Sequence, residues 1–244
     1  NHLVMENNNY PPYFNRAQFE QSSQALDTRV SQVMKRVYVK MFLGLLVTAF
    51  VALWCQNSPS AINFFLTNRW SMWLLIIAEF GLVIGISGAI NRLSSMAATG
   101  LFYLFAVVNG LMLFPIFMVY SPDSMAKTFF ITAGVFGAMS VYGYFTSQNL
   151  AKWGSFLIMA LIGLIVVSLV NIFLKSSSLD WIISGAGVLI FIGLTAWDTQ
   201  QIKTMAQQSP GAAVAKLATI GALSLYLDFI NLFLYLLRFF GNRD

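Results

Sequence analysis

Apolar runs of about 20 residues recur along almost the whole chain. An α-helix of this length and composition spans the hydrocarbon core of a bilayer, which is about 30 Å thick. Seven such runs lie at about 37–55, 70–90, 96–119, 126–146, 153–174, 181–202 and 213–239. The short alternating segments of membrane β-barrels do not occur in the sequence. We therefore predict an all-α membrane protein with seven transmembrane helices.

The charge distribution divides the chain into a tail and a membrane domain. Of the 244 residues, 58% are hydrophobic and only 9% are charged, whereas about 25% of the residues of a soluble domain are charged. Residues 1–34 are polar and predict a disordered tail, or at most a short surface helix; residues 35–244 form the predicted transmembrane domain. Most of the 14 lysines and arginines fall in the tail and in alternate loops, which favours a cytoplasmic N-terminus.

The composition also excludes several classes of function. The chain has one cysteine, Cys55, and one histidine, His2, so His/Cys metal clusters and Ser–His or Cys–His catalytic sites are not expected. We predict neither an enzyme nor a bound cofactor. The net charge of +5 lies at helix ends and in the tail, where membrane topology explains it better than nucleic acid binding. The predicted partner is the lipid bilayer.

Two aspartates, Asp198 and Asp228, lie inside the sixth and seventh apolar runs. An aspartate at the centre of a membrane helix costs roughly 2.5 to 3.5 kcal/mol. Acids kept at such positions usually handle protons or cations. Without a function, Asp198 would be an acid at the membrane interface, and Asp228 would form a structural hydrogen bond.

Helical spacing places both acids on polar stripes, which in membrane helices face the bundle. One stripe holds Ser224, Asp228, Asn231 and Tyr235, and the other holds Thr195, Asp198 and Gln201. Asp198 is expected near the end of its helix. Asp228 is expected roughly 22 Å along the next helix, at 1.5 Å per residue. Contact between the two acids therefore requires one of them to leave its expected depth.

The C-terminal segment Ala222–Gly241 resembles the signature helix of the Bax inhibitor-1 family. Ala196–Ile202 is similar to a second signature of that family, with Trp197 where tyrosine is usual. Asn109-Gly110 and the following Leu113–Ile116 are similar to its third helix, and Phe136–Gly143 to its fourth.

This resemblance implies two three-helix layers around a central seventh helix. It also implies a pH-sensitive calcium leak, with calcium as the transported ion, in a bacterial inner membrane. Asp198 and Asp228 match the pH-responsive acid pair of the family, and Arg92 matches its arginine latch. Glu79 is the candidate for the acid that bacterial members carry in the second helix.

These residues suggest a gate. Two carboxylates in a site of low dielectric constant do not both ionise easily, so the pair would titrate as a unit. We expect ionised aspartate to hold Arg92 and close the cytoplasmic end, and protonation to release it. Calcium prefers six to eight oxygens, so Asp198 and Asp228 would bind it weakly and transiently, with Glu79, Asn231 and Thr195 along the pathway.

The sequence is also compatible with other hypotheses about the function and about the roles of these residues. The same acids suit a proton-coupled cation exchanger. A non-transporting regulator that binds a membrane protease or a cell-death protein through residues 1–34 is a third possibility. Arg92 alone would be an ordinary basic anchor at a helix end, and Glu79 alone a structural hydrogen-bonding residue.

Overall fold

A computed structural model describes residues 16–90, 92–209 and 214–241. Every regular element in these ranges is an α-helix, as expected where a bilayer offers the backbone no hydrogen-bond partners. The helices are α1 (Arg16–Gln56), α2 (Pro59–Thr67), α3 (Arg69–Ala89), α4 (Ser95–Val119), α5 (Pro122–Phe145), α6 (Ala151–Leu174), α7 (Ser177–Gln208) and α8 (Val214–Phe240). Seven of them, all but α2, are long and apolar enough to cross a membrane. The predicted all-α membrane fold is confirmed.

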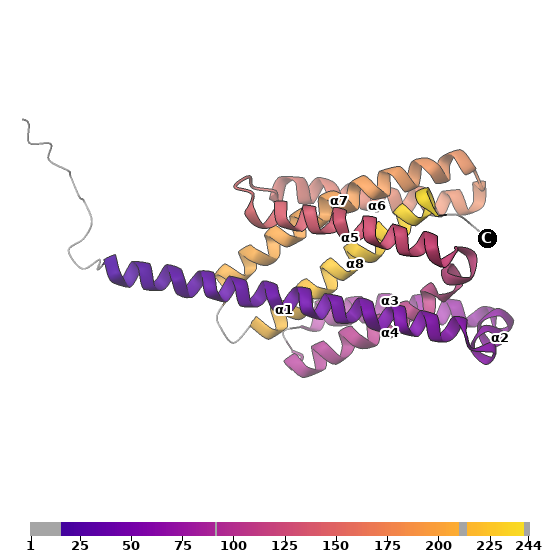
Figure 1. The fold of residues 1–244 in the computed structure, drawn as a ribbon, viewed down its shortest axis with the longest axis horizontal. Helices are drawn as coiled ribbons and strands as arrows, with labels where there is room; N and C mark the ends of the chain where they lie inside the picture. The colour runs from indigo at the N-terminus through magenta and orange to yellow at the C-terminus, as the bar shows by residue number, and fades with distance from the viewer. Residues whose placement is uncertain (1–15, 91, 210–213, 242–244) are drawn as a thin grey trace, which may run out of the picture.

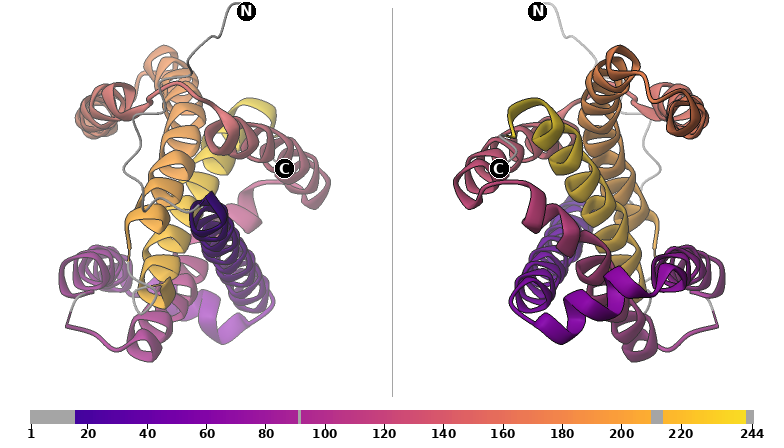
Figure 2. Two further views of the ribbon diagram at one scale, coloured as in Figure 1. Left: turned by 90° about the vertical axis from the view of Figure 1, so that its left-hand side faces the viewer. Right: turned by 90° about the vertical axis from the view of Figure 1, so that its right-hand side faces the viewer.

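Helix α8 lies between two layers of helices. Helices α1, α3 and α4 form one layer with the short α2, and α5, α6 and α7 form the other (Figure 1). Helix α8 packs against α1, α4, α5 and α7, while α3 packs on α4 and α6 packs on α7. The two views of Figure 2 show α8 in yellow between these layers. This is the arrangement that the resemblance implied.

The distribution of buried residues follows from this arrangement. In the most apolar stretch of α8, 67% of the residues are buried, against 6% in α3 and 11% in α6. The apolar side chains that α3 and α6 leave exposed, such as Ile77 and Phe173, face the region that lipid occupies in a membrane protein. Central position and not hydrophobicity therefore distinguishes α8.

Serine caps begin several of the helices. Ser94, Ser121 and Ser176 each precede a helix, and each side chain accepts a hydrogen bond from a backbone N–H three residues on. Ser58 does the same for α2, where Pro59 occupies the first turn. Such caps satisfy backbone N–H groups that a helix cannot pair internally. Helix α2 was not expected from the sequence; its Ile62 and Phe65 pack on a small core around Cys55 and Phe114.

The first helix begins earlier than the sequence suggested. It starts at Arg16, so residues 16–34 of the predicted tail are helical and not disordered; residues 1–15 lie outside the described part. Val30, Val33 and Val37 are buried in the main core. The guanidinium of Arg29 donates a hydrogen bond of 3.0 Å to the carbonyl of Ser209, just after α7. An apolar stripe that begins at Val30 thus anchors the end of a segment whose average composition is polar, while residues 21–29 are mostly exposed.

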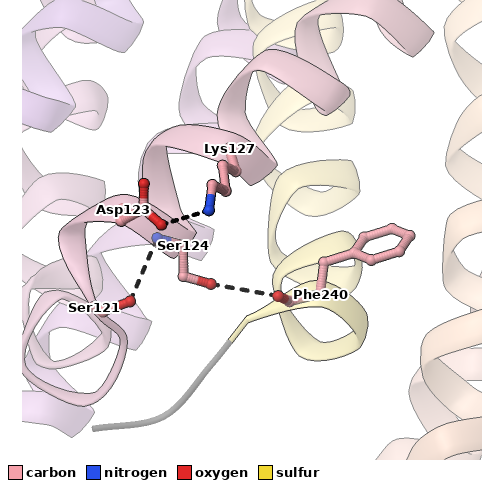
Figure 3. A network of polar contacts seen from close by, with 5 residues as sticks. All are labelled: Ser121, Asp123, Ser124, Lys127 and Phe240. Carbon is pink, nitrogen blue, oxygen red and sulfur yellow. Dashed lines mark hydrogen bonds and ion pairs between the residues drawn. The ribbon is translucent and has the colours of Figure 1, made fainter.

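The far end of α8 is fastened to the start of α5. Figure 3 shows Ser124 Oγ donating a hydrogen bond of 3.3 Å to the carbonyl of Phe240. Beside it, Asp123 and Lys127 form an exposed ion pair of 2.6 Å. An exposed pair contributes little to stability. Asp123 is therefore an exposed acid away from Asp198 and Asp228, and Asp123→Asn is a suitable control for substitutions of those two residues.

Candidate functional site

The carboxyl groups of Asp198 on α7 and Asp228 on α8 lie next to each other, close enough to share a hydrogen bond. A carboxyl oxygen can donate only when it carries a proton, so this bond requires at least one of the two acids to be protonated. Asp228 is 4% exposed, and Asp198 is half-buried. The pair joins α8 to the layer that contains α7.

The length of α7 explains how the two acids meet. The sequence placed the end of this helix at about residue 202, but α7 continues to Gln208. Asp198 is therefore ten residues from the end of α7, about 15 Å, and Asp228 is 14 residues from the start of α8, about 21 Å. The remaining offset of about 6 Å lies within the reach of two tilted helices and their side chains.

A cavity of about 770 Å³ lies beside the aspartate pair. Five helices line it: α3, α4, α6, α7 and α8. Its polar lining comprises Glu79, Asn109, Asp198, Gln201, Ser224, Asp228, Asn231 and Tyr235, and Trp197 adds an amphipathic ring. All four residues of the polar stripe predicted on the last helix therefore line one cavity. Three acids from three different helices are part of this lining.

Glu79 and Asn109 form the second polar group of this cavity. The Asn109 side-chain N–H donates a hydrogen bond of 2.6 Å to Glu79 Oε1, which joins α3 to α4. Asn109 Oδ1 and Asp228 Oδ2 are both buried without a hydrogen-bond partner among the described residues. Buried polar atoms are usually paired, so two unpaired acceptors on residues that line one cavity call for a functional explanation.

Within the described residues, the basic side chains Arg92, Lys40 and Lys203 do not pair with the two aspartates. Arg92 is exposed in the loop between α3 and α4, and within the described residues no ion pair joins it to either aspartate. Lys40 donates hydrogen bonds of 2.7 Å to Thr99 and Thr219. Lys203 donates one of 2.7 Å to the carbonyl of Tyr144. The predicted contact between Arg92 and the pair is thus absent in this conformation.

The segment around Asp198 is held on its other sides by tight packing. Gly143 of α5 lies against the carbonyl of Ala196, and a Cβ at Gly143 would collide with it. Gly154 of α6 lies in the same way against the indole of Trp197. Close helix approach at small residues is typical of membrane bundles. The Trp197 that departs from the usual signature is accommodated by this glycine.

Polar contacts to the α5–α6 loop fix α7 further. Gln200 donates a hydrogen bond of 2.7 Å to the Gln148 carbonyl and accepts one of 2.8 Å from the Leu150 N–H. These contacts, with the two glycines, fix the rotation of α7 about its axis. Rotation is what determines whether Asp198 faces α8.

The remaining predicted pathway residues are placed as follows. Asn231 lines the cavity, although its side-chain N–H donates to the carbonyl of Leu227 in its own helix. Thr195 is fully buried, donates to the Phe191 carbonyl and does not line the cavity. The sequence reasoning missed Asn109 as a site residue. An asparagine inside an apolar run was the available signal.

The described residues contain no cluster of three or more His, Cys, Asp or Glu side chains able to hold a metal ion. Glu79 therefore stands apart from the aspartate pair although both line the same cavity. The cavity can offer a cation carboxylates and amide oxygens at separate positions. It is not built as a closed cage of six to eight oxygens.

Comparison with known proteins agrees with this architecture. A sequence profile described as "Inhibitor of apoptosis-promoting Bax1" matches residues 30–244. The chain is 50% identical over 213 residues to the "Inner membrane protein YbhL" of Escherichia coli (strain K12), which covers 86% of this chain and 91% of that protein. It is 46% identical over 215 residues to an uncharacterized protein of Borreliella burgdorferi, covering 87% of this chain and 93% of the relative. An uncharacterized protein of Rickettsia prowazekii is 42% identical over 222 residues, covering 91% and 94%. The chain therefore belongs to the Bax inhibitor family of membrane proteins.

Proposed function

We propose that the chain is a pH-sensitive cation leak, with calcium as the transported ion, in a bacterial inner membrane with its N-terminus in the cytoplasm. The observation that carries the proposal is the cavity on which Glu79, Asp198 and Asp228 meet. Within the described residues, none of Arg92, Lys40 and Lys203 neutralises the aspartate pair. Acids at membrane depth that line a cavity mark ion or proton pathways.

The shared proton is the proposed sensor. While one proton bridges Asp198 and Asp228, the pair carries at most one negative charge and the two helices stay joined. Rising pH removes this proton, and the two carboxylates then repel each other in a site of low dielectric constant. A cation must then compensate them, and the two candidates are calcium and the guanidinium of Arg92.

Arg92 is the proposed latch of the deprotonated state. The loop that carries it connects α3 to α4, the two helices that also carry Glu79 and Asn109. Drawing Arg92 to the ionised aspartates would bring the ends of α3 and α7 together and close the cavity. The conformation described here, with a carboxyl–carboxyl bond and an exposed Arg92, corresponds to the protonated state of this cycle.

Calcium would pass through the cavity without tight binding. The separated acids provide two stations: Glu79 with Asn109, and the aspartate pair with Asn231. An ion that binds at several weak sites can leave each of them, which conduction requires. Tight binding would need the full set of oxygens that the cavity does not bring together.

A proton-coupled exchanger is the second candidate, and the shared proton is the observation that favours it. A proton and a cation would compete for the same two carboxylates, which is the basis of exchange. A leak moves calcium down its gradient when both sides have the same pH. An exchanger moves calcium against its gradient when a proton gradient is imposed.

Purified protein in liposomes with calcium and pH dyes separates these candidates. The leak predicts calcium entry at equal pH on both sides, faster at pH 6 than at pH 8, with no obligatory proton counterflow. Uphill calcium movement driven by a pH step would establish the exchanger instead. If the purified protein moves no ion under either condition, the leak is wrong and the result favours the hypothesis of a non-transporting regulator.

A further inference from the structure

A second cavity, of about 650 Å³, lies between α1 and α5 on the other side of α8. Phe229 of α8 lines it and packs against Phe129 and Phe136 of α5. The preceding residue, Asp228, lines the acidic cavity. Helix α8 therefore separates two cavities, one acidic and one apolar.

The lining of this second cavity is mostly hydrocarbon and lies within helices that cross the membrane. Its apolar residues include Met41, Phe42, Leu45, Phe129, Phe136 and Val141. Phe42 and Val141 are more than half exposed, so the cavity is an open groove on the surface of the bundle. In a bilayer, lipid and not water bathes such a surface.

The groove is long and narrow. Its α1 side runs from Ser31 to Leu45 and its α5 side from Phe129 to Phe145. At 1.5 Å per residue these lengths are about 21 Å and about 24 Å. An acyl chain reaches about half of the hydrocarbon thickness of a bilayer, roughly 15 Å, so the groove is long enough to hold one chain and to continue toward its headgroup.

One end of the groove is polar and basic. Lys35 and Ser31 line it on α1, and Tyr144 lines it on α5. The ammonium of Lys203 lies 4.8 Å from the centre of the Tyr144 ring, which adds a second positive charge at this end. Basic pockets between transmembrane helices suit anionic lipid headgroups.

A buried hydroxyl lies close to this end. Ser140 lines the groove about one helical turn before Tyr144. It is 5% exposed, and its Oγ has no hydrogen-bond partner among the described residues. A serine in a helix commonly donates to the carbonyl four residues back, as Thr132 does here to Thr128. Ser140 instead keeps a free donor in the groove, about 6 Å along α5 from Tyr144 at the basic end.

We propose that this groove binds one acyl chain of an anionic phospholipid, with the phosphate at Lys35 and an ester carbonyl accepting a hydrogen bond from Ser140. The proposal does not depend on ion transport. The occupant would pack on Phe229, so it would stabilise α8 from the side opposite the aspartate pair.

The charge at Lys35 should decide which lipid binds. A chain that moves from the bilayer into the groove gains little hydrophobic free energy, because both surroundings are apolar. One basic residue near the headgroup favours anionic lipid by about fivefold. The acyl chain therefore provides the fit, and the headgroup provides the selectivity.

Native mass spectrometry of the full chain in detergent, titrated with phosphatidylglycerol or phosphatidylcholine, tests the proposal. Gly137→Leu should fill the groove, because Gly137 lines it and a Cβ there meets no atom within 4 Å. Gly134→Leu is the matched control: a Cβ at Gly134 also meets no atom within 4 Å, but Gly134 does not line the groove. Lys35→Gln is compared with Arg36→Gln, since the neighbouring Arg36 lies outside the groove.

We expect the first phosphatidylglycerol molecule to bind more tightly than the molecules that bind after it, both to the unmodified chain and to the Gly134→Leu variant. Gly137→Leu should weaken this first binding by about tenfold. Lys35→Gln should reduce the preference for phosphatidylglycerol over phosphatidylcholine by about fivefold. Arg36→Gln should leave this preference unchanged. Equal binding by the two glycine variants would overturn the proposal. So would a lipid-free dimer that Gly137→Leu abolishes, because a second copy of the chain would then occupy the groove.

Discussion

The carboxyl groups of Asp198 and Asp228 lie close enough to share a hydrogen bond between two helices, while Arg92, the residue expected to hold them, is exposed and forms no ion pair with either within the described part of the chain. A carboxyl–carboxyl bond exists only while a proton is present. We therefore expect the pair to link α7 and α8 with a strength that depends on pH. The predictions below follow from this link and from the contacts that position it.

The folded chain should lose stability as pH rises. We expect a proton shared between the two adjacent carboxyl groups in the native chain to be released when unfolding separates them, so that the native state binds more protons. The free energy of unfolding then falls with increasing pH, by up to about 1.4 kcal/mol per pH unit while one proton is being lost. Thermal unfolding in detergent between pH 5 and pH 8 measures this. Asp228→Asn should flatten the dependence, because its amide donates without a titrating proton, whereas Asp123→Asn should not.

Arg92→Gln should affect transport at one end of the pH range only. If Arg92 closes the deprotonated state, its loss raises calcium flux at pH 8 and leaves the flux at pH 6 unchanged. Liposome flux at both pH values gives the comparison, with Lys175→Gln as a control at another helix end. An equal change at both pH values would mean that Arg92 is a basic anchor and not a latch.

Asn109→Leu should weaken both the fold and the pathway. It removes the donor to Glu79 and leaves this half-buried side chain without its partner, at a cost of roughly 1 kcal/mol. We expect a lower melting temperature and slower calcium flux. Glu79→Gln tests the same contact without leaving an unpaired charge. If it slows flux but does not lower stability, the role of Glu79 lies in transport.

Gly143→Ala should destabilise the bundle, although helix propensity alone predicts that it would stabilise α5. Alanine normally stabilises a helix relative to glycine by up to about 1 kcal/mol. Here the added Cβ would collide with the carbonyl of Ala196 and push α5 away from α7. Overpacking of this kind costs about 1–3 kcal/mol. Gly134→Ala, in the same helix with open space around the new Cβ, should be neutral or stabilising, and thermal unfolding compares the two.

Much of the fold follows from the sequence because a bilayer leaves few choices. Apolar runs of spanning length must be helices, and all seven runs are. Three differences, the early start of α1, the short helix α2 and the extension of α7 to Gln208, depend on features that a length rule cannot see. Helix α1 extends back to Arg16 because its apolar stripe finds a surface on α7 and α8, and α2 forms because Ser58 and Pro59 begin it.

The site could be predicted in its members but not in its geometry. The stripe spacing on the last helix placed Ser224, Asp228, Asn231 and Tyr235 on one face, and that face lines the cavity. The depth of Asp198 could not be read from the sequence, because the polar end of α7 beyond residue 202 resembles a loop in composition. Thr195 shares the helical face of Asp198 but is covered by packing, which depends on neighbouring helices.

The most direct test is calcium flux into liposomes as a function of pH for the unmodified chain and for Asp198→Asn, with Asp123→Asn as the control. We predict that flux through the unmodified chain and the control rises as pH falls from 8 to 6. Asp198→Asn should give a flux that no longer depends on pH, because the pair has lost its shared proton. A pH dependence that survives unchanged in Asp198→Asn would contradict the account.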